Sequence, residues 1–231
     1  MQELTVRLEM VYEQVRSAVS EPGSTRVIDV GSDHGYLALR CLDSSLVSSA
    51  VCTEIHKAPA KRSETALILA GYKERSEVFV TDGLNGVPLK EGDIVVIAGM
   101  GGLNIIDIVT RALKDNGSEV MKKVTFVLQP QKSNDTVRKF LAETGFTYQD
   151  ESVCCDRDIF YNCMRVTYKG ESYSLTDEEA CYGPVLLERY NEGDKEVIAY
   201  FAHLDDIFEI RQRSNPVVKS ALEARKKNER K

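Results

Sequence analysis

The sequence of 231 residues has no tryptophan, only three histidines, and no apolar stretch long enough to cross a bilayer. Its six cysteines form no C-x-x-C pair and have no partnered histidine spacing, so neither a zinc site nor a redox motif is indicated. A basic and apolar N-terminal segment with a cleavage site is also missing. From these absences we expect a cytoplasmic protein that neither spans a membrane nor binds a metal.

The chain also lacks an overall excess of positive charge, since its formal net charge is −6, although phosphate neutralisation favours basic proteins in nucleic-acid binding. Basic side chains are nevertheless concentrated at residues 219–231, which contain six basic and two acidic residues. This tail either contacts a nucleic-acid backbone or is a solvated end of the chain. Five other basic residues are candidates for phosphate contacts or for exposed helix faces: Arg7, Arg16, Lys57, Lys61 and Arg62.

The most informative pattern that is present lies at residues 27–37, where an apolar run ends at a turn that contains Gly31 and Gly35. In an α/β sheet such a turn exposes backbone N–H groups at the start of the next helix, where they can hold a carboxylate or a phosphate. The glycine spacing differs from the dinucleotide fingerprint, which disfavours a nicotinamide or flavin enzyme. S-adenosylmethionine fits better, because Asp29 or Asp33 can hold its amino-acid end.

Two further acidic residues follow later apolar runs. Glu54 closes the run that begins at Ala50, a little over twenty residues after the first turn, where a ribose diol needs a bidentate acceptor. Asp82 follows the run at residues 77–81 and can accept a hydrogen bond from an adenine amino group, while Leu84 packs on the ring. Each acid taken alone is equally compatible with capping the following helix.

A glycine-rich turn, Gly99-Met-Gly-Gly102, follows the apolar strand predicted at residues 93–98. In a doubly wound sheet this turn lies beside the first one, so the methyl donor and the acceptor would meet above it. The alternative is a tight turn before a helix that begins near Leu103. A fifth strand at residues 124–128 leads to Gln129-Pro130, where the loop either touches a base or only closes a turn.

Helical periodicity alternates with these strands, which favours a parallel sheet covered by helices. Two β-like runs within residues 151–168 predict a hairpin. Beyond residue 170 the pattern is helical, with a capping box at Thr176 and Glu179 and apolar stripes that predict two packed helices. We therefore divide the chain into a domain of residues 1–169 and a helical extension of residues 170–231. The helices of the first domain are predicted at residues 3–19, 36–42, 58–70, 103–113 and 134–143.

Several motifs resemble those of the bacterial TrmK family, in the same order and over nearly the whole chain. They are Gly31-Ser-Asp-His-Gly-Tyr-Leu37, Ile97-Ala-Gly-Met-Gly-Gly102, Leu128-Gln-Pro130 and Tyr182-Gly-Pro-Val-Leu-Leu187. The resemblance implies an α/β fold with a class I, Rossmann-like methyltransferase sheet and a C-terminal helical hairpin that helps to grip tRNA. It also implies methylation of N1 of adenine 22 in tRNA, with S-adenosylmethionine as the methyl donor.

The chain departs from the usual family pattern in the first turn and near Thr81-Asp82-Gly83-Leu84, where the family often has Gly-Asn-Gly-Leu. The family usually has alanine and proline where this sequence has Gly35 and Ala38, and it often has asparagine where this sequence has Asp82. Gly35 widens the turn, Ala38 loosens the start of the helix, and Asp82 keeps an acceptor oxygen. These differences bear on cofactor affinity and leave the implied reaction unchanged.

On this interpretation Asp33 is the catalytic residue, which orients the target adenine and offsets the positive charge that develops on its ring. Its alternative role is to cap the next helix or to hold the donor's ammonium group. For Tyr36 and Met100, core packing is the alternative. The predicted cofactor-binding residues are Asp29, Gly31, Ser32, His34, Gly35, Glu54, Asp82, Gly83, Leu84, Ala98, Gly99 and Met100. The predicted substrate-binding residues are Tyr36, Gly101, Gly102, Gln129, Pro130 and Arg7.

The sequence leaves two other functions open. A methyltransferase that acts on another RNA, a protein or a small molecule would share the same cofactor residues, and a non-catalytic RNA-binding module would keep the same fold. The first would label another component of an extract instead of tRNA, whereas the second would bind tRNA without methyl transfer. We expect tRNA as the partner and a monomer in solution.

Overall fold

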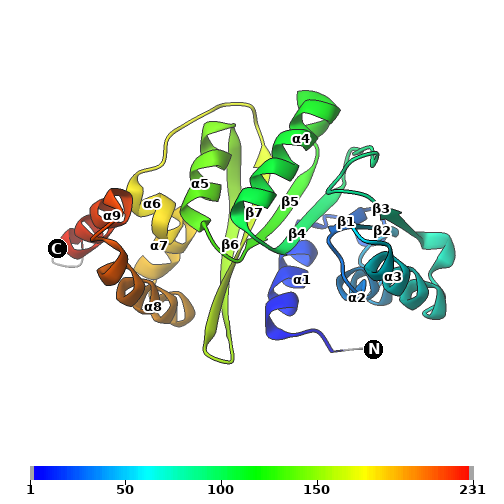
Figure 1. Ribbon diagram of the computed structural model, residues 1–231, viewed down its shortest axis with the longest axis horizontal. Helices are drawn as coiled ribbons and strands as arrows, with labels where there is room; N and C mark the ends of the chain where they lie inside the picture. Colours follow the sequence, from blue (N-terminus) through cyan, green and yellow to red (C-terminus); the bar gives the residue numbers. More distant parts are fainter. Residues whose placement is uncertain (1–2, 229–231) are drawn as a thin grey trace.

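The computed structural model describes residues 3–228, and its central element is a seven-stranded sheet with the strand order β3-β2-β1-β4-β5-β7-β6 (Figure 1). Strands β1 to β5 run parallel, whereas β7 is antiparallel to both of its neighbours. The order reverses between β1 and β4, which opens a crevice at the carboxyl ends of these strands. The strands are β1 (Arg26–Val30), β2 (Ser49–Glu54), β3 (Ser76–Val80), β4 (Ile94–Met100), β5 (Thr125–Pro130), β6 (Phe146–Asp156) and β7 (Ile159–Tyr168).

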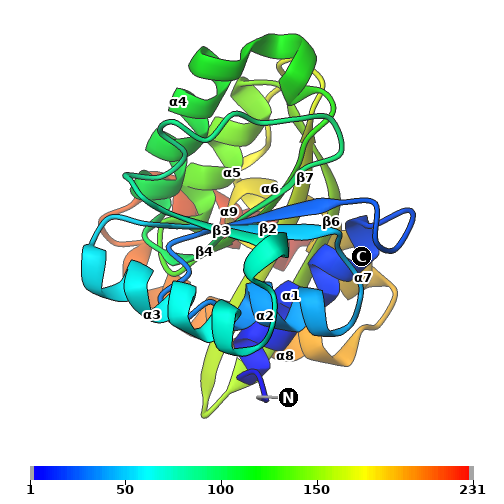
Figure 2. The same ribbon diagram turned by 90° about the vertical axis from the view of Figure 1, so that its right-hand side faces the viewer.

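Helices cover both faces of the sheet (Figure 2). Alternate residues of a strand point to opposite faces, so Val27 joins the core beneath α1 to α3, whereas Ile28 joins the core beneath α4 and α5. Within residues 3–228 no helix combines the length and the hydrophobicity that a membrane span requires. The helices that cover the two faces are α1 (Val6–Ala18), α2 (Tyr36–Asp43), α3 (Lys57–Leu69), α4 (Gly102–Met121) and α5 (Asn134–Glu143). A short 3-10 turn, η1 (Lys73–Arg75), precedes β3.

The structure differs from the predicted elements at two places in this domain. The helix predicted at residues 103–113 continues to Met121, because α4 resumes after a non-helical residue, Gly117, with φ of +73°. The hairpin begins at Phe146, earlier than predicted, because polar residues on one face hide the alternation and a bulge shifts the register between Tyr148 and Asp150. Neither difference changes the order of the strands.

The C-terminal part is helical as predicted, but its described residues form four helices instead of two. The predicted capping box is present, since the Glu179 N–H donates to Oγ1 of Thr176 and the Thr176 N–H donates to the Glu179 carboxylate. The additional helix starts fall at Pro184 and Pro216, where a proline is compatible only with a first turn. The four helices are α6 (Asp177–Tyr182), α7 (Pro184–Asn191), α8 (Lys195–Arg211) and α9 (Pro216–Asn228).

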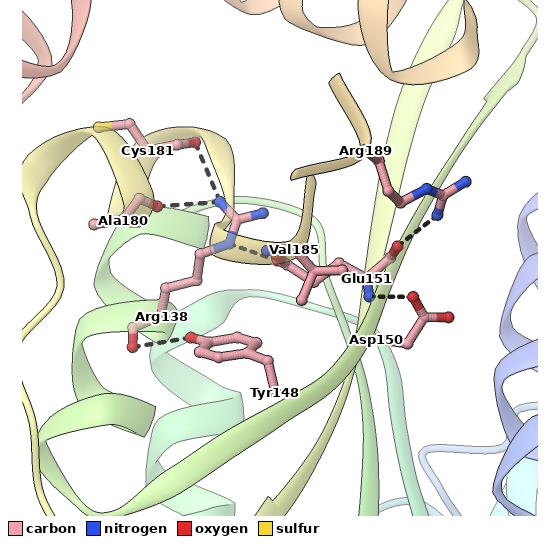
Figure 3. Close-up of polar contacts among 8 residues, drawn as sticks. All are labelled: Arg138, Tyr148, Asp150, Glu151, Ala180, Cys181, Val185 and Arg189. Carbon is pink, nitrogen blue, oxygen red and sulfur yellow. Dashed lines mark hydrogen bonds and ion pairs between the residues drawn. The ribbon is translucent and has the colours of Figure 1, made fainter. Parts of the chain in front are cut away.

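A buried polar cluster joins these helices to the sheet, and we call it the Arg138–Glu151 junction (Figure 3). Arg138 of α5 and Glu151 of β6 are fully buried and form an ion pair with 2.8 Å between Nε and Oε1. Nη1 of Arg138 also donates to the carbonyl oxygens of Ala180 and Cys181, each at 3.1 Å. The Val185 N–H donates to Oε2 of Glu151 at 3.1 Å. Each ion gains hydrogen bonds beyond the pair itself, and these offset the cost of its burial.

Gly183, between α6 and α7, is required by this junction. Its φ is +104°, and a Cβ atom there would lie 2.6 Å from Oε2 of Glu151 and 2.8 Å from Nη2 of Arg138. A side chain at this position would therefore displace the ion pair. The motif Tyr182-Gly-Pro-Val-Leu-Leu187 is thus explained by the attachment of the C-terminal helices.

Candidate active site

A cleft of about 350 Å³ opens at the crevice between β1 and β4. The turn after β1, the end of β2, the loop after β3 and the first turns of α4 all contribute to it. Five of the predicted cofactor residues line this cleft, namely Gly31, Glu54, Asp82, Gly83 and Met100. Residues far apart in the sequence are therefore brought to one edge of the sheet, as the doubly wound plan requires.

The turn after β1 packs closely against the end of β4 and against α3 at the edge of the cleft. Gly31 has φ of +72° and donates its N–H to the carbonyl oxygen of Thr53 at 2.8 Å. A Cβ atom at Gly31 would overlap the methyl group of Met100, so no larger residue fits without displacing that side chain. Gly35 has φ of +70°, and a Cβ there would lie 3.4 Å from Cβ of Ser63, where α2 and α3 approach each other.

Glu54 lies at the end of β2 and is 8% exposed. Its Oε1 accepts a hydrogen bond from the backbone N–H of Asp33, which fixes the carboxylate against the first turn. Among the described residues, none donates a hydrogen bond to Oε2 of Glu54. A carboxylate that is held on one side and open on the other is suited to accept from a ribose diol.

Asp29 is placed behind the cleft and not in its lining. It lies in β1, is almost fully buried, and faces the charge of Glu54. Burial first, and the nearby Glu54 carboxylate second, raise the pKa of Asp29 to about 7. The structure therefore makes Asp29 a neighbour of the cleft whose charge changes near neutral pH.

The loop after β3 is held by a residue that the sequence analysis did not identify. Nη1 of Arg111 lies 3.1 Å from one carboxylate oxygen of Asp82, and Nη2 lies 3.2 Å from the other. Arg111 also pairs with Asp107, one turn earlier in α4, at 2.8 Å. The i, i+4 spacing of Asp107 and Arg111 was a visible signal, but only the fold shows that this helix faces Asp82.

Two other residues near this loop contribute to packing. Gly83 has φ of +62°, and a Cβ there would lie 2.9 Å from Cγ1 of Ile108 in α4. Leu84 is buried in the core beneath α4 and does not line the cleft. The prediction that Leu84 packs on the adenine ring is therefore not supported by its position.

The glycine-rich turn after β4 forms the boundary between this cleft and the loop after β5. The Gly99 N–H donates to Oε1 of Gln129 at 3.1 Å, and Nη1 of Arg7 donates to the same oxygen at 2.9 Å. Ala98 is the half-buried residue that precedes Gly99 in β4. Gln129 and Pro130 are buried, so Gln129 links Arg7 to the turn and is not itself exposed to a base.

The last two glycines of this turn differ in their surroundings. A Cβ at Gly101 would lie 3.3 Å from Cε of Lys132, whereas a Cβ at Gly102 would lie 2.7 Å from the Lys132 carbonyl oxygen. Gly102 also donates its N–H to that carbonyl oxygen at 3.1 Å and begins α4. Gly102 therefore serves the start of the helix, which was the structural alternative for this turn.

Asp33 and the residues after it form the rim of the site. The Asp33 side chain is 66% exposed, and one of its oxygens lies 2.9 Å from Nη2 of Arg62 in α3. His34 stacks on Tyr36 with 5.0 Å between ring centroids, and Oγ of Ser32 lies 3.1 Å from Oγ of Ser63. Asp33 is the exposed member of this group, His34 and Tyr36 are half-buried, and Ser63 is fully buried.

Most of the basic residues considered for phosphate contacts have partners within the protein. Arg16 pairs with Glu13, Lys61 with Glu64, and Lys226 with Glu209. In α9, Arg225 is buried against the rings of Tyr182, Tyr190 and Phe201. The last part of the basic tail, residues 229–231, lies outside the described residues.

Metal ions in proteins are commonly bound by clusters of side chains with nitrogen, sulfur or oxygen donor atoms. Within residues 3–228, no group of three or more histidine, cysteine, aspartate or glutamate side chains is arranged to hold a metal ion.

Over residues 27–227 the sequence matches the TrmK family, described as tRNA (adenine(22)-N(1))-methyltransferase. The chain belongs to this family. The tRNA (adenine(22)-N(1))-methyltransferase of Bacillus subtilis is 28% identical over 150 residues, which cover 65% of this chain and 59% of that protein. The protein MG248 of Mycoplasma genitalium is 30% identical over 167 residues, or 70% of each chain.

Solved structures of TrmK-like proteins share the fold. Streptococcus pneumoniae Sp1610, in complex with S-adenosyl-L-methionine, has a TM-score of 0.79 and 25% identity, and the match covers 97% of this chain and 99% of that one. Bacillus subtilis TrmK has a TM-score of 0.73 and 23% identity over 97% of this chain and 94% of that one. These matches confirm the class I methyltransferase fold. They also confirm the predicted reaction, in which S-adenosylmethionine donates a methyl group to N1 of adenine 22 in tRNA.

Proposed function

We propose that the cleft beside Gly31 binds S-adenosylmethionine and that the exposed rim at Asp33 receives adenine 22 of tRNA. The observation that carries this assignment is the meeting of Gly31, Glu54 and Asp82 at one cleft, next to the glycine-rich turn after β4. It is supported by membership of the TrmK family. The two alternatives, a methyltransferase with a different acceptor and a non-catalytic RNA-binding module, have no comparable support.

The residues that are present fit the donor. Gly31 and Gly83 line the cleft, and glycine is required at both because a Cβ would overlap Met100 at the first position and crowd Ile108 at the second. Glu54 would accept from the ribose hydroxyls and Asp82 from the adenine amino group, while Arg111 holds Asp82 in place. When bound, S-adenosylmethionine supplies a methyl group on a positively charged sulfur that is already activated for displacement.

The protein's own contribution to the reaction is mainly positioning. N1 of adenine is a nucleophile without a strong base, so holding it in line with the methyl group supplies much of the catalysis. N1 is hidden in a Watson–Crick pair, and the base must be unpaired or turned out before it can enter. Asp33 would then accept from the adenine amino group and offset the positive charge of the product ring, while Tyr36 packs against the base.

We further propose a division into a methyltransferase domain of residues 1–169 and a helical extension of residues 170–231. The division is supported by the separate apolar core of the C-terminal helices, although Val153 of β6 contributes to it. One chain contributes all the residues that line the cleft, and we propose a monomeric enzyme that needs no metal. Since tRNA modification takes place where tRNA is available, we propose a cytoplasmic location.

A direct assay tests this function. Purified protein is incubated with radiolabelled S-adenosylmethionine and unmodified tRNA, and the label is mapped to a nucleotide. We expect label on N1 of adenine 22 and none on a transcript in which guanine replaces that adenine. Label on a cytosine, or on protein alone, would contradict the proposal.

A further inference from the structure

A second cavity, of about 460 Å³, lies between the loop after β5 and helix α8, and we call it the β5–α8 groove. Its volume is within the range of about 300–1,000 Å³ that is typical of small-molecule sites. The loop side contributes Lys132 and Asn134, and the helix side contributes His203 and Arg211. None of the donor-binding residues lines it, so this cavity is separate from the cleft beside Gly31.

The groove adjoins the acceptor side of the active site through Lys132. The position of a Cβ at Gly101 lies 3.3 Å from Cε of Lys132, so the lysine stem covers the glycine-rich turn. The Gln131 N–H donates to the carbonyl oxygen of Met100 at 2.8 Å, which fixes the same loop to the end of β4. A chain bound above Gly101 would therefore pass Lys132 to reach the groove.

The groove contains two half-buried aromatic rings that lie next to each other. Phe160 of β7 and His203 of α8 both line it, with 5.0 Å between ring centroids and 32° between ring planes. Unpaired nucleobases stack on phenylalanine and histidine rings in this manner. Oδ1 of Asn134, a residue that lines the same cavity, is buried and accepts no hydrogen bond from the described residues.

The charge of the groove suits a phosphodiester. Lys132 and Arg211 are exposed, and neither forms an ion pair with another residue among 3–228. By contrast, Lys61, Arg62 and Lys226 are each paired with a carboxylate. One acidic residue, Asp135, also lines the groove, so it is not uniformly basic.

We propose that the β5–α8 groove binds a second unpaired nucleotide of the same tRNA, adjacent to the target adenine. Its base stacks against Phe160 and His203, and its phosphates lie between Lys132 and Arg211. A nucleotide is available there because turning one base out of a stack also exposes its neighbours. The proposal rests on the proposed function, since it assumes that adenine 22 enters the adjoining site.

Steady-state kinetics with full-length tRNA test the groove, using Arg211→Ala and His203→Ala. Stacking on an aromatic ring contributes enough that its loss is expected to raise KM for tRNA about 5-fold or more in His203→Ala. Arg211→Ala is expected to raise KM about 3-fold or more and to lower the salt dependence of tRNA binding by about one unit of slope. For both variants we expect kcat and S-adenosylmethionine affinity to change by less than about 2-fold, because neither residue touches the donor cleft.

Arg213→Ala is the matched control, because Arg213 is exposed just beyond α8 and does not line the groove. Melting temperatures show whether His203→Ala still folds, and Arg211→Ala, at an exposed position, keeps the test decisive if it does not. Ultraviolet cross-linking of wild-type protein to tRNA should add a nucleotide next to position 22 to a peptide that contains Phe160 or His203. Unchanged KM values in both variants, or equal effects in Arg213→Ala, would overturn the groove assignment. Label on adenine 22 by wild-type protein would at the same time leave the proposed function standing.

Discussion

The donor cleft and the Arg138–Glu151 junction both concentrate charged residues, but they hold them in opposite ways. Asp33 and Asp82 at the cleft are largely exposed, and they are paired with arginines from two helices, α3 and α4 respectively. Arg138 and Glu151 at the junction are fully buried and are surrounded by main-chain partners. Exposed pairs exchange partners with water at little cost, whereas a buried ion that loses its partner is strongly destabilised.

The difference shows where this protein keeps charged groups exposed to solvent and where it keeps them buried. A site that binds a charged donor and releases a charged product needs carboxylates that can change partners. A junction that orients the C-terminal helices on the sheet needs partners that do not change. Four substitutions test whether changes at the junction mainly affect stability and changes at the donor cleft mainly affect activity.

The largest effect on stability is expected from Glu151→Gln. This change leaves Arg138 buried without a counter-charge and should lower the free energy of unfolding by about 3–5 kcal/mol. Urea unfolding measures it. Asp177→Asn is the control, because its pair with Lys139 is about one-third exposed and should contribute less than about 1 kcal/mol. Similar losses in the two variants would remove the distinction between the junction and a surface pair.

The largest effect on activity is expected from Asp33→Ala. Loss of one group that stabilises developing charge should lower the single-turnover rate by roughly 10²- to 10³-fold, with a smaller change in donor affinity measured by calorimetry. The free energy of unfolding should hardly change, because the side chain is exposed. Arg62→Ala is the control, because it removes the ion pair but keeps the Asp33 carboxylate. Equal losses of turnover and donor affinity would reassign Asp33 to the cofactor.

Gly183→Ala sharpens the comparison within the C-terminal part. The positive φ alone should cost about 1–2 kcal/mol, and overlap with Glu151 should add about 1–3 kcal/mol. Gly193→Ala is the matched control, because Gly193 has φ of +84° and open space around its Cβ position. Chemical denaturation of both variants measures the difference. Equal losses would show that the junction tolerates a methyl group beside its ion pair.

The smallest effect is expected from Asp29, whose pKa is raised from 3.8 to about 7. A carboxyl with a raised pKa contributes stability while it is protonated in the folded state, and that contribution is lost as pH rises towards and through 7. Between about pH 6.5 and about pH 7.5, wild-type protein should lose roughly 0.7 kcal/mol of unfolding free energy that Asp29→Asn does not lose. Parallel pH profiles for the two proteins would contradict the buried pair of Asp29 and Glu54.

Much of the fold was predictable because it depends on short-range patterns. Apolar runs that end in glycine or an acid indicated four of the parallel strands, a run that ends at Gln129-Pro130 indicated the fifth, and a 3.6-residue stripe indicated α1. The extension of α4 beyond Gly117 and the early start of β6 were missed, because a break and a polar face weaken the local signal. Leu84 was assigned to the cleft because its neighbour is Asp82, but its side chain points into the core.

The sequence by itself determined which glycine or acidic residues follow the successive strands, which residues form the turns, and the family of the protein. Only the tertiary structure decided that Arg111 holds Asp82, that Gln129 is buried beneath Arg7, and that Arg138 meets Glu151 and the main chain of α6. The physical reason is range. A turn or a strand end is specified by neighbours along the chain, whereas an ion pair depends on which elements the packing of the whole core brings together.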